Sequence, residues 1–333
     1  GYVMKIGING WGRIGRCAAR QIMDAGKDTL LKINGSGDEF TNTWLLEHDS
    51  VHGRWKNHIS EIVEWTNQRD IYFLDWTDCD VVLECTGSYN DGRVCQQHLY
   101  NGAKKVLISA PAINVDKTIV YGVNHSLLDN NDKIVSAASC TTNCLAPIVN
   151  CLKAGFGIES AQMTTIHSYT GDQPTIDRRH KDLYRARAAL QSIIPTSTGA
   201  TKAIEEIFPE LTGKIAGSAV RVPTPNVSAV DLSFVAKRHV TVDEINNYVY
   251  NSSRTGVIDY DEGPKVSIDF NTTESPCIFA PQHTRVVDNL VRVFCWYDNE
   301  WAYASQMIKT ATLMGKLNEY ETHYGSEQYE FAL

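Results

Sequence analysis

The segment SCTTNC at residues 139–144 contains the side chain best suited to nucleophilic chemistry, Cys140. An apolar run with helical spacing follows at residues 145–152, so Cys140 is predicted to lie at the start of a helix. A helix N-terminus favours a thiolate, and its backbone N–H groups can bind an oxyanion. The alternative is a buried cysteine that acts as a small apolar residue, and a neighbouring base would decide between the two.

His167 is the candidate for that base. It lies near the end of the strand-like segment 161–168 and before a long loop, so its imidazole can project from the end of a strand toward a helix start. A single histidine is more often structural than catalytic, and other histidines of the chain show no comparable grouping. Those interpreted as structural or solvent-facing are His48, His52, His58, His98 and His125.

A glycine motif at residues 10–15, GWGRIG, indicates a dinucleotide site. Gly10 permits a tight turn, Gly12 lets the backbone approach a pyrophosphate, and Gly15 lets a helix pack closely on a strand. The motif alone is weak evidence. Here it stands between a strand pattern at 5–9 and a helix pattern at 13–25, which is the context that dinucleotide binding requires.

The end of the second predicted strand reads Asn34-Gly35-Ser36-Gly37, without the acid that would accept hydrogen bonds from the adenosine ribose. Without that carboxylate, nothing there repels a 2'-phosphate, so NADP becomes admissible. The alternative is that Asp38 supplies the acid and that the cofactor is NAD.

The elements needed to position these groups are those of a Rossmann-type, doubly wound α/β sheet. Strand patterns in the first part of the chain lie at 5–9, 30–34, 81–85, 106–109 and 119–123. After Cys144 the pattern changes to strand-like segments at 161–168, 217–222, 227–237 and 290–297, which predict an α+β domain with a mainly antiparallel sheet.

We therefore expect two domains, as the length of 333 residues also suggests. Residues 1–145 form the dinucleotide-binding domain, completed by a C-terminal helix within 301–333, and residues 146–300 form the catalytic and tetramerisation domain. The weakly patterned stretch 171–197, rich in Arg and Asp, is predicted to be a functional loop.

Charge and cysteine content narrow the class of function. A net charge of -8 without a basic run argues against nucleic acid or an acidic membrane as a partner. No apolar stretch is long enough to span a bilayer, and the nine scattered cysteines suit a reducing, cytoplasmic location. Cys140 and Cys144 lack a second Cys or His pair nearby, so no metal site is expected.

Several longer motifs resemble the glyceraldehyde-3-phosphate dehydrogenases from nearly one end of the chain to the other. They are GINGWGRIGR at 7–16, HDSVHG at 48–53, SCTTNC at 139–144, RVPTPNVS at 221–228 and WYDNEW at 296–301. The resemblance implies that His167 draws the proton from Cys140, whose sulfur attacks the aldehyde. Hydride then leaves for the nicotinamide, and inorganic phosphate cleaves the thioester.

The same resemblance assigns the remaining site residues. Thr170 and Arg221 match the pocket for the C3 phosphate of glyceraldehyde 3-phosphate, and Asn299 matches the residue that orients the nicotinamide carboxamide. The residues that match the inorganic phosphate pocket are Ser139, Thr141, Thr198 and Gly199. The predicted cofactor contacts are Asn9, Gly10, Gly12, Arg13, Ile14, Gly15, Asn34, Gly35, Ser36, Ser109, Arg178, Arg179 and Asn299. A homotetramer acting in glycolysis or gluconeogenesis is also implied.

Two departures from the family pattern concern the cofactor. NAD-specific members place an acid where Gly35 stands, and often a Leu-Pro pair where Arg178 and Arg179 stand, in a loop that reaches a neighbouring subunit's cofactor. Losing a negative charge and gaining two guanidinium groups suits a 2'-phosphate, so NADP is expected, alone or alongside NAD. The alternative is that both arginines face solvent or pair with Asp177 and Asp182.

Two other functions compete with this interpretation. An erythrose-4-phosphate dehydrogenase would share the cysteine and the histidine but hydrolyse its thioester, and it tends to lose the phosphate-site residues that this chain keeps. A catalytically idle relative could serve as a binding scaffold, since a fold does not fix a function. An idle site, however, has no physical reason to keep Cys140, His167, Arg221 and Asn299 together.

Overall fold

The computed structural model describes residues 1–324, and it divides the chain into two compact units. The first comprises Gly1–Ala138 and the residues from Ala304 onward, and the second comprises Ser139–Tyr303. This division precedes the expected boundary at residue 145 because all of the helix that begins at Cys140 belongs to the second unit. Residues 325–333 of the expected C-terminal helix lie outside the described residues.

A seven-stranded sheet with the order β5-β2-β1-β6-β7-β9-β8 organises the first unit. All neighbouring strands pair in parallel, which confirms the Rossmann-type fold. The strands are β1 (Lys5–Asn9), β2 (Thr29–Asn34), β5 (Glu64–Thr66), β6 (Val81–Glu84), β7 (Lys105–Ile108), β8 (Lys117–Thr118) and β9 (Ile134–Ser136). The strand order reverses between β1 and β6, and ligands of such sheets bind at the carboxyl ends of the strands at this point.

Helices α1 (Arg13–Ala25), α2 (Glu39–Glu47) and α3 (Gly92–Tyr100) connect these strands, and a short hairpin joins β3 (His48–Asp49) to β4 (Gly53–Arg54). The helix α1 ends where expected because Gly26 adopts a left-handed conformation, with φ 62°, and its N–H bonds the carbonyl of Ile22. The final helix, α7, spans Trp301–Tyr324, within the range expected for the C-terminal helix.

The strand predicted at residues 119–123 is wrong. The two-residue β8 ends at Thr118, just before this segment, and a turn follows at residues 121–124. The side chain of Asn124 closes this turn by accepting a hydrogen bond from the N–H of Val120 at 2.8 Å and donating to the carbonyl of Thr118 at 3.0 Å. Gly122 supplies the positive φ, 92°, that the turn requires. Local side-chain bonds therefore outweigh the β-branched composition of the segment.

The second unit contains an eight-stranded sheet with the order β11-β12-β10-β13-β17-β15-β14, and β16 pairs with β17. Only β10 with β12 and β14 with β15 are parallel, so the expected mainly antiparallel sheet is confirmed. Its strands are β10 (Ser160–Ser168), β11 (Ile194–Thr196), β12 (Ile215–Val222), β13 (Ser228–Val235), β14 (Ile258–Tyr260), β15 (Cys277–Phe279), β16 (Arg285–Val287) and β17 (Leu290–Tyr297).

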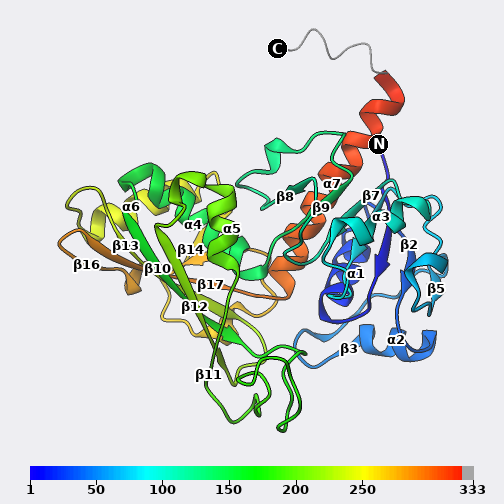
Figure 1. Ribbon diagram of the computed structural model, residues 1–333, viewed down its shortest axis with the longest axis horizontal. Helices are drawn as coiled ribbons and strands as arrows, with labels where there is room; N and C mark the ends of the chain where they lie inside the picture. The colour runs from blue at the N-terminus through cyan, green and yellow to red at the C-terminus, as the bar shows by residue number, and fades with distance from the viewer. Residues whose placement is uncertain (325–333) are drawn as a thin grey trace. The chain divides into compact units, whose positions relative to one another are not determined.

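Three helices of this unit, α4 (Cys140–Phe156), α5 (Ala200–Ile207) and α6 (Val242–Ser253), pack together along one face of the sheet (Figure 1). The long segment between β10 and β11 extends beyond the edge of the sheet (Figure 1). Short 3-10 helices lie at Ile71–Phe73, His125–Leu127, Pro209–Leu211, Ser267–Phe270 and Pro281–His283. Among the described residues, no helix has the length and apolar character needed to cross a membrane.

Candidate active site

Cys140 is the first residue of α4, and its position is fixed by the capping of that helix. Ser139 is the N-cap residue, and its hydroxyl oxygen accepts a hydrogen bond from the N–H of Thr142 at 3.0 Å. The amide of Asn143 donates to the carbonyl of Ser139 at 2.8 Å. The cap places the sulfur at the positive end of the helix dipole, as the sequence predicts.

His167 lies on β10 with its side chain only 4% exposed, and its Nε2 is 3.4 Å from the Sγ of Cys140. Its Nδ1 is 2.7 Å from the carbonyl oxygen of Ser168. A carbonyl only accepts, so Nδ1 carries the proton and Nε2 presents its lone pair to the thiol. The imidazole is therefore in the tautomer that a base requires.

Burial sets the ionisation of this pair. Burial, reinforced by the Arg221 guanidinium, lowers the pKa of His167 to about 3. Burial raises the pKa of the Cys140 thiol, while Arg221 opposes this shift. Both directions favour a neutral thiol beside a neutral imidazole, whereas the sequence suggested a thiol already acidified by the helix. A nucleophilic attack by this sulfur would therefore have to transfer the thiol proton as it proceeds, and Nε2 of His167 is placed to accept it.

Arg221 stands beside His167 because the two are paired in the β10–β12 register. Its Nη1 donates to the hydroxyl of Thr170 at 3.1 Å and to the side-chain carbonyl of Gln173 at 3.3 Å. The Nε of Arg221 and the Nε2 of Gln173 are buried and have no hydrogen-bond partner among the described residues. Two unsatisfied donors this close together suit an anionic ligand. Sequence reasoning identified Thr170 and Arg221 but missed Gln173, which is 8% exposed.

The hydroxyl of Thr141 faces into the unit, 2.8 Å from the hydroxyl of Tyr297. Tyr297 in turn lies 2.8 Å from the hydroxyl of Thr165, which donates to the carbonyl of Ala229 at 3.1 Å. Because Thr165 donates its hydroxyl proton to that carbonyl, Tyr297 must donate to Thr165, and Thr141 must donate to Tyr297. The hydrogen bonds of these three hydroxyls therefore all run in one direction, and the part that Tyr297 plays in them was not apparent from the sequence.

Thr198 and Gly199 lie just before α5, on another segment of the second unit. Gly199 is the N-cap residue of that helix, and the hydroxyl of Thr198 accepts from the N–H of Ala200 at 3.2 Å. Neither residue is hydrogen-bonded to Ser139 or Thr141 in the part of the chain that the structure describes. Their place at a helix N-terminus is favourable for an anion.

Asn299 is buried, and its amide is oriented by two serines. Its Oδ1 accepts from the hydroxyls of Ser168 at 3.0 Å and Ser228 at 2.9 Å. The hydroxyl oxygen of Ser228 accepts from the N–H of Ser168 at 3.1 Å, so its own proton is available for Asn299. Because two hydroxyls donate to one side of the amide, that side must be the oxygen. The NH₂ group on the other side remains available to donate to another partner.

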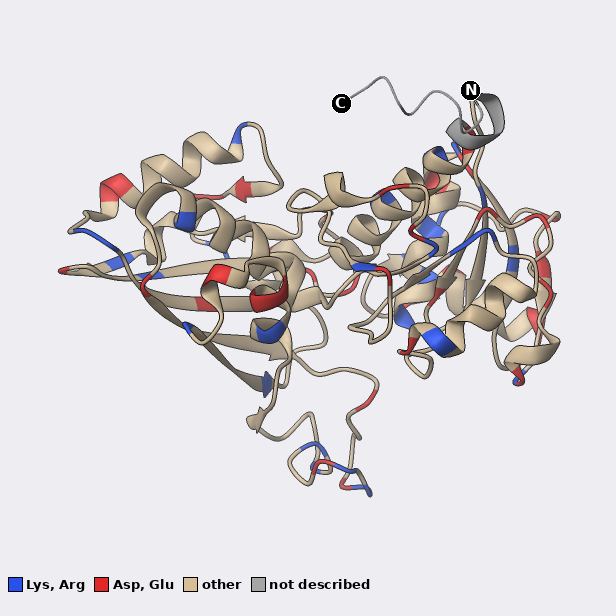
Figure 2. Cartoon of the chain, turned by 45° about the horizontal axis from the view of Figure 1, so that its top comes forward, with Lys and Arg blue, Asp and Glu red and all other residues tan. Residues whose placement is uncertain are grey.

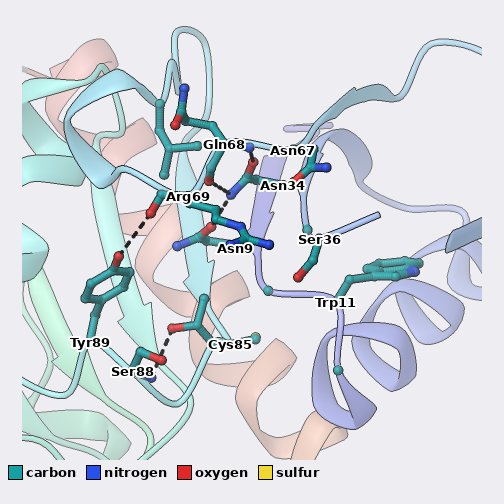
Figure 3. Close-up of a pocket in the computed structure, with 15 residues that line it drawn as sticks. Asn9, Trp11, Asn34, Ser36, Asn67, Gln68, Arg69, Cys85, Ser88 and Tyr89 are labelled. Atoms are coloured by element: carbon teal, nitrogen blue, oxygen red, sulfur yellow. Dashed lines mark hydrogen bonds between the residues drawn. The ribbon is translucent and has the colours of Figure 1, made fainter. Parts of the chain in front are cut away.

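The first unit contains a cavity of about 520 Å³ at the carboxyl ends of β1, β2 and β6, where the strand order reverses (Figure 3). Of the predicted cofactor residues in this unit, those that line the cavity are Asn9, Gly10, Gly12, Asn34, Gly35 and Ser36. Arg13, Ile14, Gly15 and Ser109 do not line it. Arg13 instead forms a bidentate ion pair with Asp49, at 2.5 and 3.0 Å.

The glycines of the motif fit a dinucleotide. A Cβ on Gly12 would meet no atom within 4 Å, so this residue opens onto free space at the start of α1. A Cβ on Gly15 would lie 2.2 Å from the carbonyl oxygen of Gly10, which explains why the helix can approach the strand only with glycine there. Gly10 has a φ of 107°, as the tight turn requires. The backbone therefore forms a cradle suited to a pyrophosphate.

No Asp or Glu lines this cavity, whereas the guanidinium-bearing Arg69 does (Figure 3). Asp38, the alternative acid, instead caps α2 by accepting from the N–H of Thr41 at 2.7 Å. A Cβ on Gly35 would lie 2.7 Å from the Cβ of Trp11, so an acid at that position would displace the backbone. Neither Arg69 nor this close approach was apparent from the sequence.

Arg178 and Arg179 are exposed in the loop of the second unit, where basic and acidic residues are mixed (Figure 2). Neither side chain pairs with an acid of the described chain. Asp177 pairs with Arg187 at 2.8 Å, and Asp182 accepts from Thr196 at 3.1 Å. The ion pairs considered as an alternative for the two arginines are therefore wrong.

Comparisons with known proteins agree with both units. Residues 4–92 match the family described as glyceraldehyde 3-phosphate dehydrogenase, NAD binding domain, and residues 139–299 match its C-terminal domain. The chain is 46% identical over 330 residues to the glyceraldehyde-3-phosphate dehydrogenase of Cereibacter sphaeroides, covering 94% of this chain and 99% of that protein. It is 47% identical over 332 residues to the enzyme of the same name from Xanthobacter flavus, with the same coverage. The chain therefore belongs to the glyceraldehyde-3-phosphate dehydrogenase family.

Proposed function

We propose that this chain catalyses the reversible, phosphate-dependent oxidation of glyceraldehyde 3-phosphate to 1,3-bisphosphoglycerate. Relatives named glyceraldehyde-3-phosphate dehydrogenase match this chain over nearly their full length. The observation that carries the proposal is the 3.4 Å approach of the lone pair of His167 Nε2 to the sulfur of Cys140. A nucleophile and a base in this geometry support acyl chemistry on an aldehyde.

In the proposed reaction the thiol proton of Cys140 moves to Nε2 of His167 as a bond forms between sulfur and the aldehyde carbon. His167 then donates this proton to the substrate oxygen, takes it back from that oxygen as the hydride departs, and releases it to solvent. A nicotinamide cofactor would supply the acceptor for the hydride whose departure leaves a thioester on Cys140. An oxygen of inorganic phosphate then attacks the thioester, the carbon–sulfur bond breaks, and the acyl phosphate leaves.

Two groups of donors are proposed to hold the two phosphates. Thr170, Arg221 and Gln173 would bind the C3 phosphate, since Arg221 and Gln173 each keep a buried donor without a partner. The residues proposed for inorganic phosphate are Ser139, Thr141, Thr198 and Gly199. Two of these hydroxyls are already engaged, Ser139 with Thr142 and Thr141 with Tyr297, so they must exchange partners when phosphate binds.

NADP is the proposed cofactor, with NAD as a second substrate. The cavity wall supports this choice because it carries a guanidinium, Arg69, and no carboxylate. Arg178 and Arg179 are proposed to place further positive charge beside the cofactor of a neighbouring subunit in a homotetramer. Asn299, with its NH₂ group left as a donor, would hold the nicotinamide carboxamide.

A steady-state assay with glyceraldehyde 3-phosphate tests these assignments by comparing NAD with NADP, each with and without inorganic phosphate. We expect turnover to require phosphate and NADP to give the higher kcat/KM. Turnover without phosphate would refute acyl transfer to phosphate and favour hydrolysis. A large excess of NAD over NADP in kcat/KM would refute the cofactor preference and leave the reaction itself unchanged.

A further inference from the structure

Glu84 is a buried carboxylate that the reaction described above does not use. It ends β6 and is paired with Asn9 of β1, at the point where the strand order reverses. The side chain is 1% exposed, and no Lys or Arg of the described chain pairs with it. A buried carboxylate of this kind is costly unless hydrogen bonds satisfy it fully.

Four hydrogen bonds satisfy Glu84. Its Oε1 lies 2.7 Å from the Nδ2 of Asn9 and 2.9 Å from the Nε2 of His98. Its Oε2 accepts from the N–H of Thr86 at 2.9 Å and from the Thr86 hydroxyl at 2.7 Å. The indole N–H of Trp76 donates to Nδ1 of His98 at 2.9 Å, so Nε2 of His98 carries the proton. All four partners are donors, which is the pattern of an ionised carboxylate.

These bonds continue into the wall of the dinucleotide cavity. The Oδ1 of Asn9 accepts from Nδ2 of Asn34 at 2.8 Å. Asn34 in turn bonds both backbone groups of Gln68, donating to its carbonyl at 2.9 Å and accepting from its N–H at 2.8 Å (Figure 3). Asn9, Asn34, Gln68 and Thr86 all line the cavity, whereas Glu84 does not. One carboxylate thus connects cavity segments that follow β1, β2, β5 and β6.

We propose that Glu84 is a positioning residue for the nicotinamide dinucleotide, because its ionised carboxylate fixes Asn9 and Thr86 in the cavity wall. A carboxylate has acceptor sites for all four donors, whereas the amide of a glutamine places an NH₂ group against two of them. The hydroxyl of Thr86 can rotate to accept from such an NH₂ group, but the N–H of Thr86 cannot. If the amide is reversed, the N–H of His98 meets the NH₂ group, since the bond from Trp76 fixes its tautomer. In either orientation the wall must shift to relieve a contact between two donors.

The experiment compares Glu84→Gln with Asp80→Asn in the full-length protein. Asp80 is a matched control, since it immediately precedes β6 at the opposite edge of the sheet and is also buried. Its carboxylate accepts from the N–H of Lys5 at 2.8 Å and from Nζ of Lys104 at 2.9 Å, and it does not line the cavity. Calorimetric titration gives the Kd for NADP and for NAD, and thermal unfolding gives Tm.

We expect both variants to lower Tm, and only Glu84→Gln to weaken dinucleotide binding, by about tenfold or more. Equal Kd values for the two variants at similar Tm would overturn the proposal. The inference depends on the family's nicotinamide cofactor and not on the preference for NADP. If the unmodified protein bound neither dinucleotide, the cofactor assignment itself would fail, and the positioning role with it.

A second pair of variants keeps the test decisive if Glu84→Gln does not fold. His98 is buried, touches Glu84 and does not line the cavity. Glutamine at this position can still donate to Glu84 and accept from Trp76, whereas leucine can do neither. We expect His98→Gln to bind NADP like the unmodified protein and His98→Leu to bind it several-fold more weakly. Equal binding by the two variants would show that these bonds do not position the cavity wall.

Discussion

At the scale of single residues, the proposed chemistry depends on one proton transfer between Cys140 and His167. Because the pair is neutral at rest, removing the base removes the path by which the sulfur becomes nucleophilic. We expect His167→Asn to lower kcat by roughly 10²- to 10⁴-fold, the usual contribution of general base catalysis. The rate of alkylation of Cys140 by iodoacetamide should fall in parallel, measured by mass spectrometry of the labelled peptide.

His239→Asn is the control for this prediction, since His239 lies in the same unit but is exposed and pairs only with Asp288. It should leave both rates unchanged. If His167→Asn kept alkylation and turnover within a few-fold of the unmodified protein, another group would have to be the base.

The buried imidazole also makes stability depend on pH. The pKa of His167 is about 3 in the folded protein, below the ordinary value near 6.5 that the unfolded chain would show. Between these values the unfolded chain binds a proton that the folded protein does not, so the free energy of unfolding falls as pH is lowered. This one group contributes a slope of up to about 1.4 kcal/mol per pH unit.

Urea unfolding of the unmodified protein and of His167→Asn between pH 7 and pH 5 measures this effect. The variant should lose less stability than the unmodified protein over that range. Parallel slopes for His167→Asn and the unmodified protein would contradict a buried, neutral imidazole.

Cys140 and His167 could be identified from the sequence because few residue types can act as a nucleophile or as a base. The sequence did not reveal Gln173, Tyr297 or Glu84, whose importance depends on their partners. The unpartnered amide of Gln173, the hydroxyl hydrogen bonds of Tyr297 and the buried, hydrogen-bonded carboxylate of Glu84 can be recognised only when distances and burial are known. The ion pair of the Arg13 side chain with Asp49 is likewise a contact that only the structure reveals.

At the scale of elements, the N-terminus of α4 links folding to the proposed catalysis. The hydroxyl of Ser139 accepts from the N–H of Thr142, and Cys140 directly follows this cap. Ser139→Ala should cost about 1 kcal/mol of stability, as loss of an N-cap usually does. We expect a larger effect on kcat, by about tenfold or more, because a frayed first turn moves the sulfur away from Nε2 of His167.

Thr241→Ala provides the comparison, since Thr241 caps α6 in the same unit by accepting from the N–H of Glu244 at 3.1 Å. Urea unfolding and steady-state kinetics should show a similar stability loss for both variants and a loss of kcat for Ser139→Ala alone. Equal kcat values in the two variants would mean that the cap serves only the helix.

The sequence predicted elements well where hydrophobic periodicity and end signals agreed. The helix at 13–25 and the strand at 290–297 have the bounds expected of them, since Gly26 ends the first and apolar alternation marks the second. The prediction failed at 119–123, where a side-chain-closed turn replaced a strand. The helix α4 begins at Cys140, as predicted, although its apolar run begins only at residue 145. Its first turn, residues 140–144, is stabilised by the Ser139 cap and not by an apolar pattern.

At the scale of the whole molecule, the acidic residues that give the chain its negative charge do not line the cavity proposed for the cofactor. The chain carries a net charge of -8, yet no acid lines the dinucleotide cavity. The loop at 171–197 is exposed and carries apolar side chains such as Ile176 and Leu183, which are 79% and 80% exposed. Exposed side chains of this kind are expected to become buried when subunits associate, which supports the proposed homotetramer.

The last prediction joins this loop to the cofactor. If Arg178 and Arg179 approach the 2'-phosphate in a neighbouring subunit, replacing both with alanine removes charge-assisted hydrogen bonds worth about 1.5–3 kcal/mol each. The Kd for NADP should rise at least tenfold, while the Kd for NAD changes little, because NAD lacks the phosphate. Lys181→Ala with Arg187→Ala removes two charges from the same loop and should leave the ratio unchanged, with light scattering confirming an unchanged assembly in both proteins. No loss for either cofactor would mean that both guanidinium groups are simply solvated, and equal losses would mean that they act on a part common to NAD and NADP. In both cases Arg69 and the acid-free cavity wall alone would set the preference.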